Sequence, residues 1–166
     1  MKLNLFIPLV ILVGFAGSLV NAAEVGSPAP QFTLPSLQQN QRAALIQFAG
    51  KVVYLDFWAS WCAPCRTSFP LLDGLYQKLK SRGFEVVAVN LDEEKENAEK
   101  FLEHYPVNFT VLRDSEGHWA DQYGVESMPT SFIVDKKGVI QHVHNGFSKY
   151  DIDEIEKIIV ALLDKQ

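Results

Sequence analysis

The residues best suited to chemistry in this sequence are its two cysteines, Cys62 and Cys65, which stand two residues apart. They follow an apolar run and precede a stretch with helical periodicity, so they are expected at a turn between a strand and a helix. There the first thiol is expected to face solvent near the positive end of the helix, which favours the thiolate. The second thiol is close enough to attack a mixed disulfide formed by the first. The spacing therefore predicts a redox-active dithiol, with Cys62 as nucleophile and Cys65 as resolving thiol.

Two other uses of the cysteine pair are a structural crosslink and half of a metal site. A ring this short stabilises a fold by about 2 kcal/mol, compared with about 4.7 kcal/mol for a 100-residue loop, so a crosslink is a poor use of the pair. A metal site needs two further ligands, and the histidines do not form the second paired cluster that structural zinc sites usually have. The candidate ligands are His104, His118, His142 and His144, of which the last two alternate along an expected strand and so share one face. The pattern favours a redox dithiol, and neither a metal nor a cofactor is expected.

One carboxylate, Asp56, lies within the apolar run 52–58 and precedes Cys62 by six residues. Burial in such a strand disfavours the ionised form, so the pKa of Asp56 is expected to rise. A carboxylate with a raised pKa is suited to take the proton from Cys65 when that thiol attacks. The alternative is an aspartate at the strand end that turns toward solvent or caps the turn.

The elements that must position these residues are a strand over 52–58, a helix over 64–80 and a second strand over 84–91. Both strands are apolar, as buried central strands are, and Gly83 is expected to end the helix between them. A strand–helix–strand unit implies a parallel pair of strands joined by a right-handed crossover.

The second half of the chain continues with more helices and strands around the same sheet. We expect a helix over 92–104, a short strand over 109–112, a helix over 116–123, a hairpin of strands 130–134 and 139–144, and a last helix over 151–163. Asp151 with Glu154 is expected to form a capping box on the last helix. Near the N-terminus, 32–34 is expected as a short strand and 36–49 as a turn with a short helix. The order predicts an α/β fold, with a central mixed sheet and helices on both faces.

Residues 1–22 differ from the rest and are expected to be a secretory signal peptide. Lys2 gives a positive start, an uncharged apolar run follows, and cleavage is expected after Ala22. A retained membrane anchor is the alternative, because the apolar run approaches the length of a span. Either way residues 23–166 are expected as one domain in the bacterial periplasm, where disulfides persist. The formal net charge of −5 argues against nucleic acid as a partner.

Three segments together have the pattern of a known family. Residues 53–66, VYLDFWASWCAPCR, are similar to the thioredoxin active-site strand and turn. Residues 123–125 with 128–130, YGV and MPT, resemble the segment that holds the family's cis-proline, and 26–30 with 32–34, GSPAP and FTL, are typical of the TlpA-like branch. The sequence resembles the thioredoxin fold and, within it, the exported, AhpC/TSA-related thiol-disulfide oxidoreductases of the TlpA, ResA and CcmG group. The resemblance implies a thioredoxin-like fold with an N-terminal β extension.

Roles for residues around the dithiol also follow from this resemblance. Met128 and Pro129 are expected to form a cis peptide bond in a loop that faces the dithiol, with the Met128 backbone pairing with a substrate strand. The alternative is a trans proline that begins an edge strand. Trp61, with Ala63 and Pro64 between the cysteines, is expected to line an apolar substrate-binding surface.

Some positions depart from the family pattern. Ser68 stands where several TlpA-like reductases have an acidic residue, and Ala88 stands where thioredoxin has a lysine near its buried aspartate. Asp56 itself matches thioredoxin. The resemblance therefore implies proton handling that combines features of both groups. Trp58 is expected to pack in the core.

The predicted function is the reduction or isomerisation of protein disulfides by an exported enzyme. Because the periplasm is kept oxidising, electrons are expected from a membrane thiol-reductant conduit. Disulfide-bearing proteins are the expected substrates, with apocytochrome c in cytochrome c maturation as one candidate class. The alternatives are a dithiol oxidase of the same fold and a copper- or zinc-binding chaperone that uses the cysteine pair and a histidine.

Overall fold

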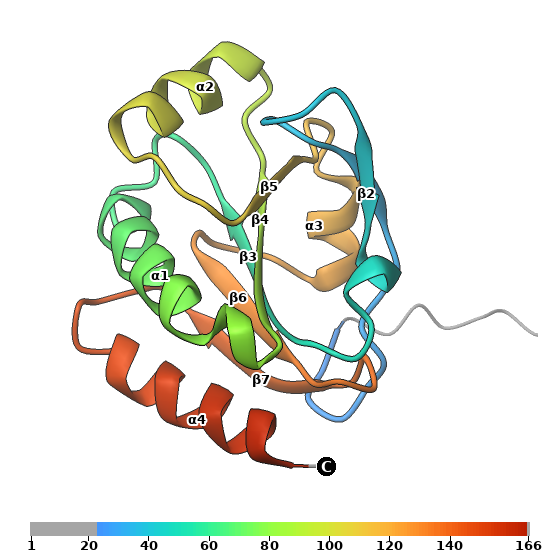
Figure 1. Cartoon of the computed structure of the whole chain (residues 1–166). Coiled ribbons are helices and arrows are strands. Elements are labelled where there is room, and N and C mark those ends of the chain that lie inside the picture. The colour runs from blue at the N-terminus through green and yellow to red at the C-terminus, as the bar shows by residue number, and fades with distance from the viewer. Residues whose placement is uncertain (1–22, 166) are drawn as a thin grey trace, which may run out of the picture.

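The computed structural model describes residues 23–165, which fold around a five-stranded mixed sheet (Figure 1). The strand order across this sheet is β5-β4-β3-β6-β7. These strands are β3 (Val52–Trp58), β4 (Phe84–Asn90), β5 (Thr110–Arg113), β6 (Thr130–Val134) and β7 (Ile140–Asn145). The helices are α1 (Cys65–Leu79), α2 (Lys95–His104), α3 (His118–Tyr123) and α4 (Ile152–Asp164), with 3-10 turns η1 (Leu45–Phe48) and η2 (Lys80–Arg82). The predicted α/β class is confirmed.

The central strand β3 carries Asp56 and leads to the cysteines. It is buried along its whole length, pairs in parallel with β4 and pairs antiparallel with β6. The outer pairs are β4 with β5 in parallel and β6 with β7 antiparallel. The two apolar runs of the sequence thus form adjacent buried strands, joined by α1 as the strand–helix–strand pattern predicts.

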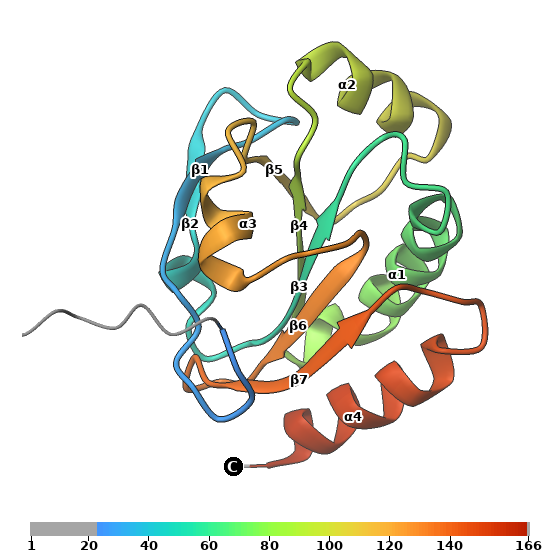
Figure 2. The ribbon, with the colours of Figure 1, turned by 180° about the vertical axis from the view of Figure 1, so that it is seen from behind.

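Helices cover both faces of the sheet (Figure 1, Figure 2). Each face has its own apolar core. Helices α1, α2 and α4 pack on one face, in a cluster that includes Tyr54, Trp58 and both cysteines. Helix α3 and the N-terminal segment pack on the other face, in a cluster that includes Leu55 and Phe57. Because successive side chains of a strand alternate between the faces, Asp56 lies on the same face as Tyr54 and the cysteines.

The N-terminal extension is a two-stranded antiparallel sheet of β1 (Thr33–Pro35) and β2 (Arg42–Ala44). The strand expected at 32–34 and the short helix expected within 36–49 are present as β1 and η1. Strand β2 is missing from the prediction. Its three residues show no alternation of apolar and polar side chains, and they are extended because they pair with β1.

The capping box expected at the start of α4 is wrong. Asp151 has helical φ and ψ of −75° and −23°, and its side chain makes no hydrogen bond to the first turn. Instead Oδ2 accepts a hydrogen bond from the Ser148 amide at 2.7 Å, and Oδ1 accepts one from Ser148 Oγ at 2.8 Å. Oδ2 also lies 3.2 Å from His144 Nε2. These upstream partners occupy the oxygens that a capping box requires.

The expected signal peptide, with cleavage after Ala22, lies outside the described residues. Within 23–165, no helix has both the length and the apolar character needed to cross a membrane.

Candidate active site

Cys62 and Cys65 form a disulfide at the junction between β3 and α1. Cys65 is the first residue of α1, and Pro64 precedes it. The amides of a first helical turn lack partners within the helix and carry partial positive charge. One of them, the Cys65 amide, donates a hydrogen bond to Cys62 Sγ at 3.3 Å. The start of the helix therefore places a donor on the sulfur that is predicted to be the nucleophile.

The expectation that Cys62 faces solvent is wrong for the disulfide form. Its exposed fraction is 3%, and Cys65 is fully buried. The disulfide and the hydrogen bond from Cys65 hold the Cys62 sulfur against the start of α1, within the apolar cluster that contains Trp58 and Phe69. Trp58 is fully buried, as predicted for a core residue.

The five residues predicted to bind substrate form a rim at this end of the sheet, defined as Trp61, Ala63, Pro64, Met128 and Pro129. The first three residues are exposed, and Trp61 keeps 66% of its surface accessible. Met128 is half-buried, Pro129 is buried, and the peptide bond between them is cis, as expected from the resemblance. Because β6 begins beside the end of β3, both loops of the rim lie at the end of the sheet where the disulfide is.

Asp56 is 1% exposed, which rules out the alternative of an aspartate turned toward solvent. Burial raises the pKa of Asp56 to about 7, and a hydrogen bond from Ser131 opposes part of that rise. Ser131 Oγ donates to Asp56 Oδ1 at 2.9 Å, whereas Oδ2 has no hydrogen-bond partner among residues 23–165. The cross-strand neighbour on β4 is Ala88, so no basic side chain occupies that position. The predicted rise in pKa is confirmed, and one carboxylate oxygen is free to take a proton.

The loop from β3 to Cys62 is anchored by a buried carboxylate, Asp92, just after β4. Asp92 Oδ2 accepts a hydrogen bond from the Ser60 amide at 3.0 Å, and Oδ1 accepts one from Ser60 Oγ at 2.8 Å. Asn90 Nδ2 donates to Oδ2 at 2.7 Å. From the sequence, Asp92 is expected only as the start of a charged helix. The sequence does contain a signal for this contact. Ser60 follows β3 and Asp92 follows β4, and the carboxyl ends of parallel strands meet at one edge of a sheet.

The sequence and the fold are both similar to those of known thiol-disulfide oxidoreductases, as a disulfide at this position suggests. A family model described as Redoxin matches residues 24–159. The chain belongs to the Redoxin family. Thiol-disulfide oxidoreductase ResA of Geobacillus thermodenitrificans is 37% identical over 134 residues, which are 80% of this chain and 76% of the relative. ResA of Bacillus subtilis is 38% identical over 132 residues, which are 80% of this chain and 72% of the relative. A Chlorobium tepidum crystal structure given the name thiol:disulfide interchange protein DsbE is 45% identical, with a TM-score of 0.82, and the match covers 86% of this chain and 99% of that one.

This Redoxin-family chain is a thiol-disulfide oxidoreductase of the ResA and DsbE type, and its two cysteines lie at disulfide distance. The predicted enzyme class, family resemblance and thioredoxin-like fold are confirmed by these matches.

The histidines of this Redoxin-family chain do not join the cysteine pair. His142 and His144 lie on the same face of β7, as predicted, with ring centroids 6.2 Å apart. His144 pairs with Asp151. In the part of the chain that the structure describes, no group of three or more His, Cys, Asp or Glu side chains is arranged to hold a metal ion. Neither histidine therefore completes a metal-binding group with Cys62 and Cys65.

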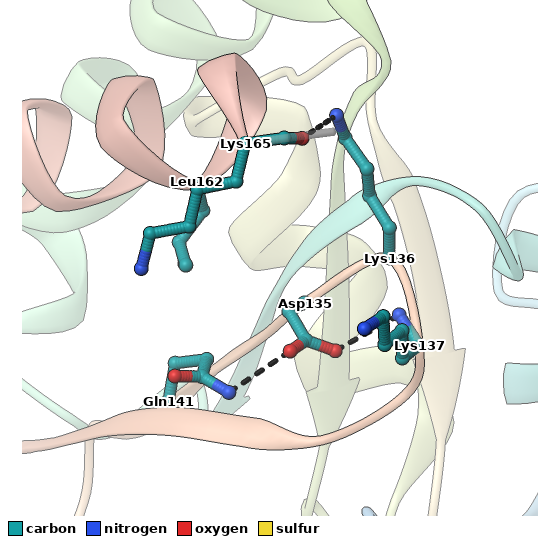
Figure 3. Close-up of a pocket in the computed structure, with 6 residues that line it drawn as sticks. All are labelled: Asp135, Lys136, Lys137, Gln141, Leu162 and Lys165. Atoms are coloured by element: carbon teal, nitrogen blue, oxygen red, sulfur yellow. Dashed lines mark hydrogen bonds between the residues drawn. The ribbon is translucent and has the colours of Figure 1, made fainter.

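A pocket between the β6–β7 turn and the end of α4 lies at the other end of the sheet (Figure 3). Lys136 Nζ donates to the carbonyl oxygens of Leu163 at 2.8 Å and Lys165 at 2.7 Å. Asp135 Oδ2 accepts a hydrogen bond from Gln141 Nε2 at 2.9 Å. Carbonyls at a helix C-terminus lack partners within the helix, so the lysine satisfies groups that need a donor. These polar groups fasten α4 to the hairpin and lie apart from the disulfide.

Proposed function

We propose that this enzyme reduces the disulfides of exported proteins, with Cys62 as the nucleophile and Cys65 as the resolving thiol. The observation that carries the proposal is the position of the Cys62–Cys65 disulfide at the start of α1, on the same sheet face as a buried carboxylate with one free oxygen. The disulfide form described here corresponds to the enzyme after it has reduced a substrate.

In the first step, the thiolate of reduced Cys62 attacks one sulfur of the substrate disulfide. A bond forms between Cys62 and that sulfur, the substrate disulfide breaks, and the second substrate sulfur leaves as a thiolate that takes a proton from water. The positive end of α1 and the Cys65 amide, which donates to Cys62 Sγ, stabilise the attacking thiolate.

In the second step, Cys65 attacks the Cys62 sulfur of the mixed disulfide. The Cys65 proton passes to Asp56 Oδ2, the bond between Cys62 and the substrate breaks, and the substrate leaves as a thiolate that is then protonated. The enzyme disulfide forms, and two electrons have moved from the enzyme to the substrate. A general base works best when its pKa lies near the working pH, and the pKa of Asp56 is about 7.

Substrates bind in this proposal on the rim formed by Trp61, Ala63, Pro64, Met128 and Pro129. Trp61 offers exposed aromatic surface beside the nucleophile, and exposed apolar patches are typical of contact sites. The backbone of Met128, just before β6, pairs with an extended segment of the substrate in this proposal. Ala63 and Pro64 lie between the two cysteines and are exposed, so an approaching substrate disulfide contacts them.

The enzyme acts in the bacterial periplasm in this proposal, after export directed by residues 1–22. Because that compartment is kept oxidising, turnover needs a membrane thiol-reductant conduit that returns two electrons to the Cys62–Cys65 disulfide. Apocytochrome c with oxidised cysteines is one candidate substrate, which would place the enzyme in cytochrome c maturation. A dithiol oxidase of the same fold would differ in the direction of electron flow.

The variant Cys65→Ala tests the order of the two steps. Without Cys65 the mixed disulfide cannot be resolved, so the reduced variant is expected to retain a disulfide-bearing protein covalently, as a non-reducing gel would show. The matched control, Cys62→Ala, removes the proposed nucleophile, keeps Cys65 and is expected to form no adduct. Equal trapping by both variants, or none by Cys65→Ala, would contradict the assignment of Cys62 as nucleophile.

A further inference from the structure

A chain of buried hydroxyl groups ends on the Asp56 carboxylate. The Tyr54 hydroxyl donates a hydrogen bond to Ser131 Oγ at 2.8 Å, and Ser131 Oγ donates to Asp56 Oδ1 at 2.9 Å. All three side chains are buried on the face of the sheet that carries the cysteines. Neither Tyr54 nor Ser131 takes part in the two steps described above.

We propose that Tyr54 and Ser131 are positioning residues that occupy Asp56 Oδ1, so that Oδ2 is the oxygen that receives the Cys65 proton. This inference rests on the proposed function of Asp56 as the base. An ionised carboxylate can only accept hydrogen bonds, so Ser131 must give its single proton to Asp56. The Ser131 oxygen is then free to accept the proton of Tyr54. The hydrogen bonds therefore run in one direction, from Tyr54 through Ser131 to Asp56.

The sheet register holds this chain in place. Asp56 and Ser131 are direct cross-strand partners on β3 and β6, and Tyr54 lies two residues before Asp56 on the same strand. Side chains that oppose each other across antiparallel strands lie on one face with their Cβ atoms close together. The serine is thus fixed by the backbone of a central sheet and not by a mobile loop. It holds one carboxylate oxygen and leaves Oδ2, which lacks a partner among residues 23–165, for the proton.

The serine hydrogen bond also opposes the electrostatic effect of burial. Burial raises the pKa of Asp56, and the bond from Ser131 lowers it, to give a value of about 7. Burial, with the nearby Asp56 charge, holds the pKa of Tyr54 well above its ordinary value, so the tyrosine stays a protonated donor. A donor to the Ser131 oxygen polarises the serine hydroxyl and strengthens its bond to Asp56. The two hydroxyls together keep part of the Asp56 population ionised at neutral pH.

Other groups face Asp56 or its partners from neighbouring elements. The Cys62–Cys65 disulfide belongs to the apolar core on the same side of the sheet as Asp56, and Ala88 is the cross-strand neighbour of Asp56 on β4. On β7, His144 is the cross-strand partner of Ser131, and its ring pairs with Asp151, which precedes α4. His142 lies on the same face of β7, with its ring stacked on that of His144. The His144 imidazole is therefore the neighbouring group whose effect must be separated from that of Ser131.

The direct test is a titration of the Asp56 carboxyl carbon by 13C NMR in the oxidised protein. Ser131→Ala is expected to raise the midpoint by about one pH unit, because the carboxylate loses a hydrogen bond. Tyr54→Phe is expected to raise it by less, since it weakens the serine bond without removing it. Ser131→Thr keeps a hydroxyl and is expected to restore the midpoint toward that of the wild type. An unchanged midpoint in Ser131→Ala would overturn the proposal.

Two controls separate the hydroxyl chain from general effects. Tyr123 is buried in the cluster on the opposite face, and its hydroxyl donates to the Pro30 carbonyl at 2.7 Å, so Tyr123→Phe makes the same chemical change away from Asp56. It is expected to leave the midpoint unchanged. His144→Gln added to Ser131→Ala removes the nearby imidazole, and the upward shift is expected to persist. An equal shift in Tyr123→Phe, or loss of the shift with His144→Gln, would contradict the roles of Tyr54 and Ser131.

The rate at which Cys65 resolves a mixed disulfide distinguishes this inference from the proposed function. A rise of one pH unit lowers the ionised fraction of Asp56 at pH 7 from about one half to about one tenth, so Ser131→Ala is expected to resolve about fivefold more slowly and to recover near pH 9. A shift of the NMR midpoint with no change in this rate would contradict Asp56 as the base. A slower rate with no shift of the midpoint would contradict the hydroxyl chain alone.

Discussion

The chemistry of Asp56 depends on its burial in β3 and on a serine from a different strand. A single acid within an apolar run is enough to predict burial and a raised pKa. The partner Ser131 could not be predicted, because it is 75 residues away and reaches Asp56 only through the pairing of β3 with β6. The burial of Cys62 differs from the prediction for a similar reason. Cysteine spacing gives the position of the dithiol, whereas the surrounding fold determines what covers it.

Asp56→Asn removes the proposed base while keeping the size of the side chain. Resolution of the mixed disulfide by Cys65 is expected to slow by about 10² at neutral pH, since general bases contribute about that factor or more. The resolution rate of the variant is also expected to lose the pH dependence that Asp56, with a pKa of about 7, gives to the wild type. Stopped-flow fluorescence of a preformed mixed disulfide measures this rate. A rate equal to that of the wild type from pH 6 to pH 8 would exclude Asp56 as the base.

The raised pKa also makes a prediction for stability. The pKa of Asp56 is about 7 in the folded enzyme, compared with an ordinary value of 3.8, so the unfolded chain binds fewer protons between these values. The free energy of unfolding is therefore expected to fall as pH rises from about 4 to 7, by up to about 4 kcal/mol. Asp56→Asn should remove this loss. Urea unfolding of both oxidised proteins at pH 5 and pH 8 tests it, and identical changes with pH in the two proteins would contradict it.

At the scale of elements, the sequence predicts the core of the sheet well and its additions poorly. Strands β3 and β4 are mostly apolar and are buried along their whole length. A long apolar run predicts a buried strand without any knowledge of which strands pair with it. Strand β2 is extended because it pairs with β1. Asp151 does not cap α4 because Ser148 donates hydrogen bonds to both oxygens of its carboxylate. The anchor of the active-site loop by Asp92 likewise depends on two strand ends that meet only in the folded sheet.

The Asp92 anchor predicts a measurable contribution to stability. Asp92→Ala leaves the Ser60 amide and the Asn90 side chain without their acceptor, so a loss of about 1–3 kcal/mol in the free energy of unfolding is expected. Glu103→Ala, at an exposed carboxylate on α2, is the control and is expected to change it by about 0.5 kcal/mol or less. Urea midpoints measure both, and equal effects would show that the Asp92 hydrogen bonds add nothing to the fold.

At the scale of the whole molecule, helices α1, α2 and α4 lie on one side of the sheet, and α3 with the N-terminal segment lies on the other (Figure 1). Each side has its own apolar core, and the disulfide belongs to the core shared by α1, α2 and α4. Two of the three segments that the sequence relates to a known family, 53–66 and 123–130, meet at the end of the sheet that carries the disulfide. The third, 26–34, packs on the opposite face. Family resemblance therefore located the site, because the first two segments belong to the elements that build it. The direction of electron flow is set by the reduction potential of the whole enzyme relative to the potentials of its redox partners.

The reductase proposal predicts a potential below about −200 mV after equilibration with a glutathione or dithiothreitol series. A strong oxidant has a highly stabilised reduced form, and here the Cys62 sulfur receives a backbone donor from Cys65 while Pro64 in the turn supplies none. Pro64→Ala adds an amide donor to the turn and is expected to raise the potential. A wild-type value near −120 mV would instead assign the enzyme as a dithiol oxidase.

The most direct test of the account is the alkylation of the reduced enzyme by iodoacetamide as a function of pH, with the modified cysteine identified by mass spectrometry. We expect Cys62 to react first, with a midpoint well below the value of about 8.5 for free cysteine, because the positive end of α1 and the Cys65 amide stabilise its thiolate. Cys65 is expected to react later, as a thiol. A Cys62 midpoint equal to that of free cysteine, or equal reaction of both thiols, would contradict the central claim.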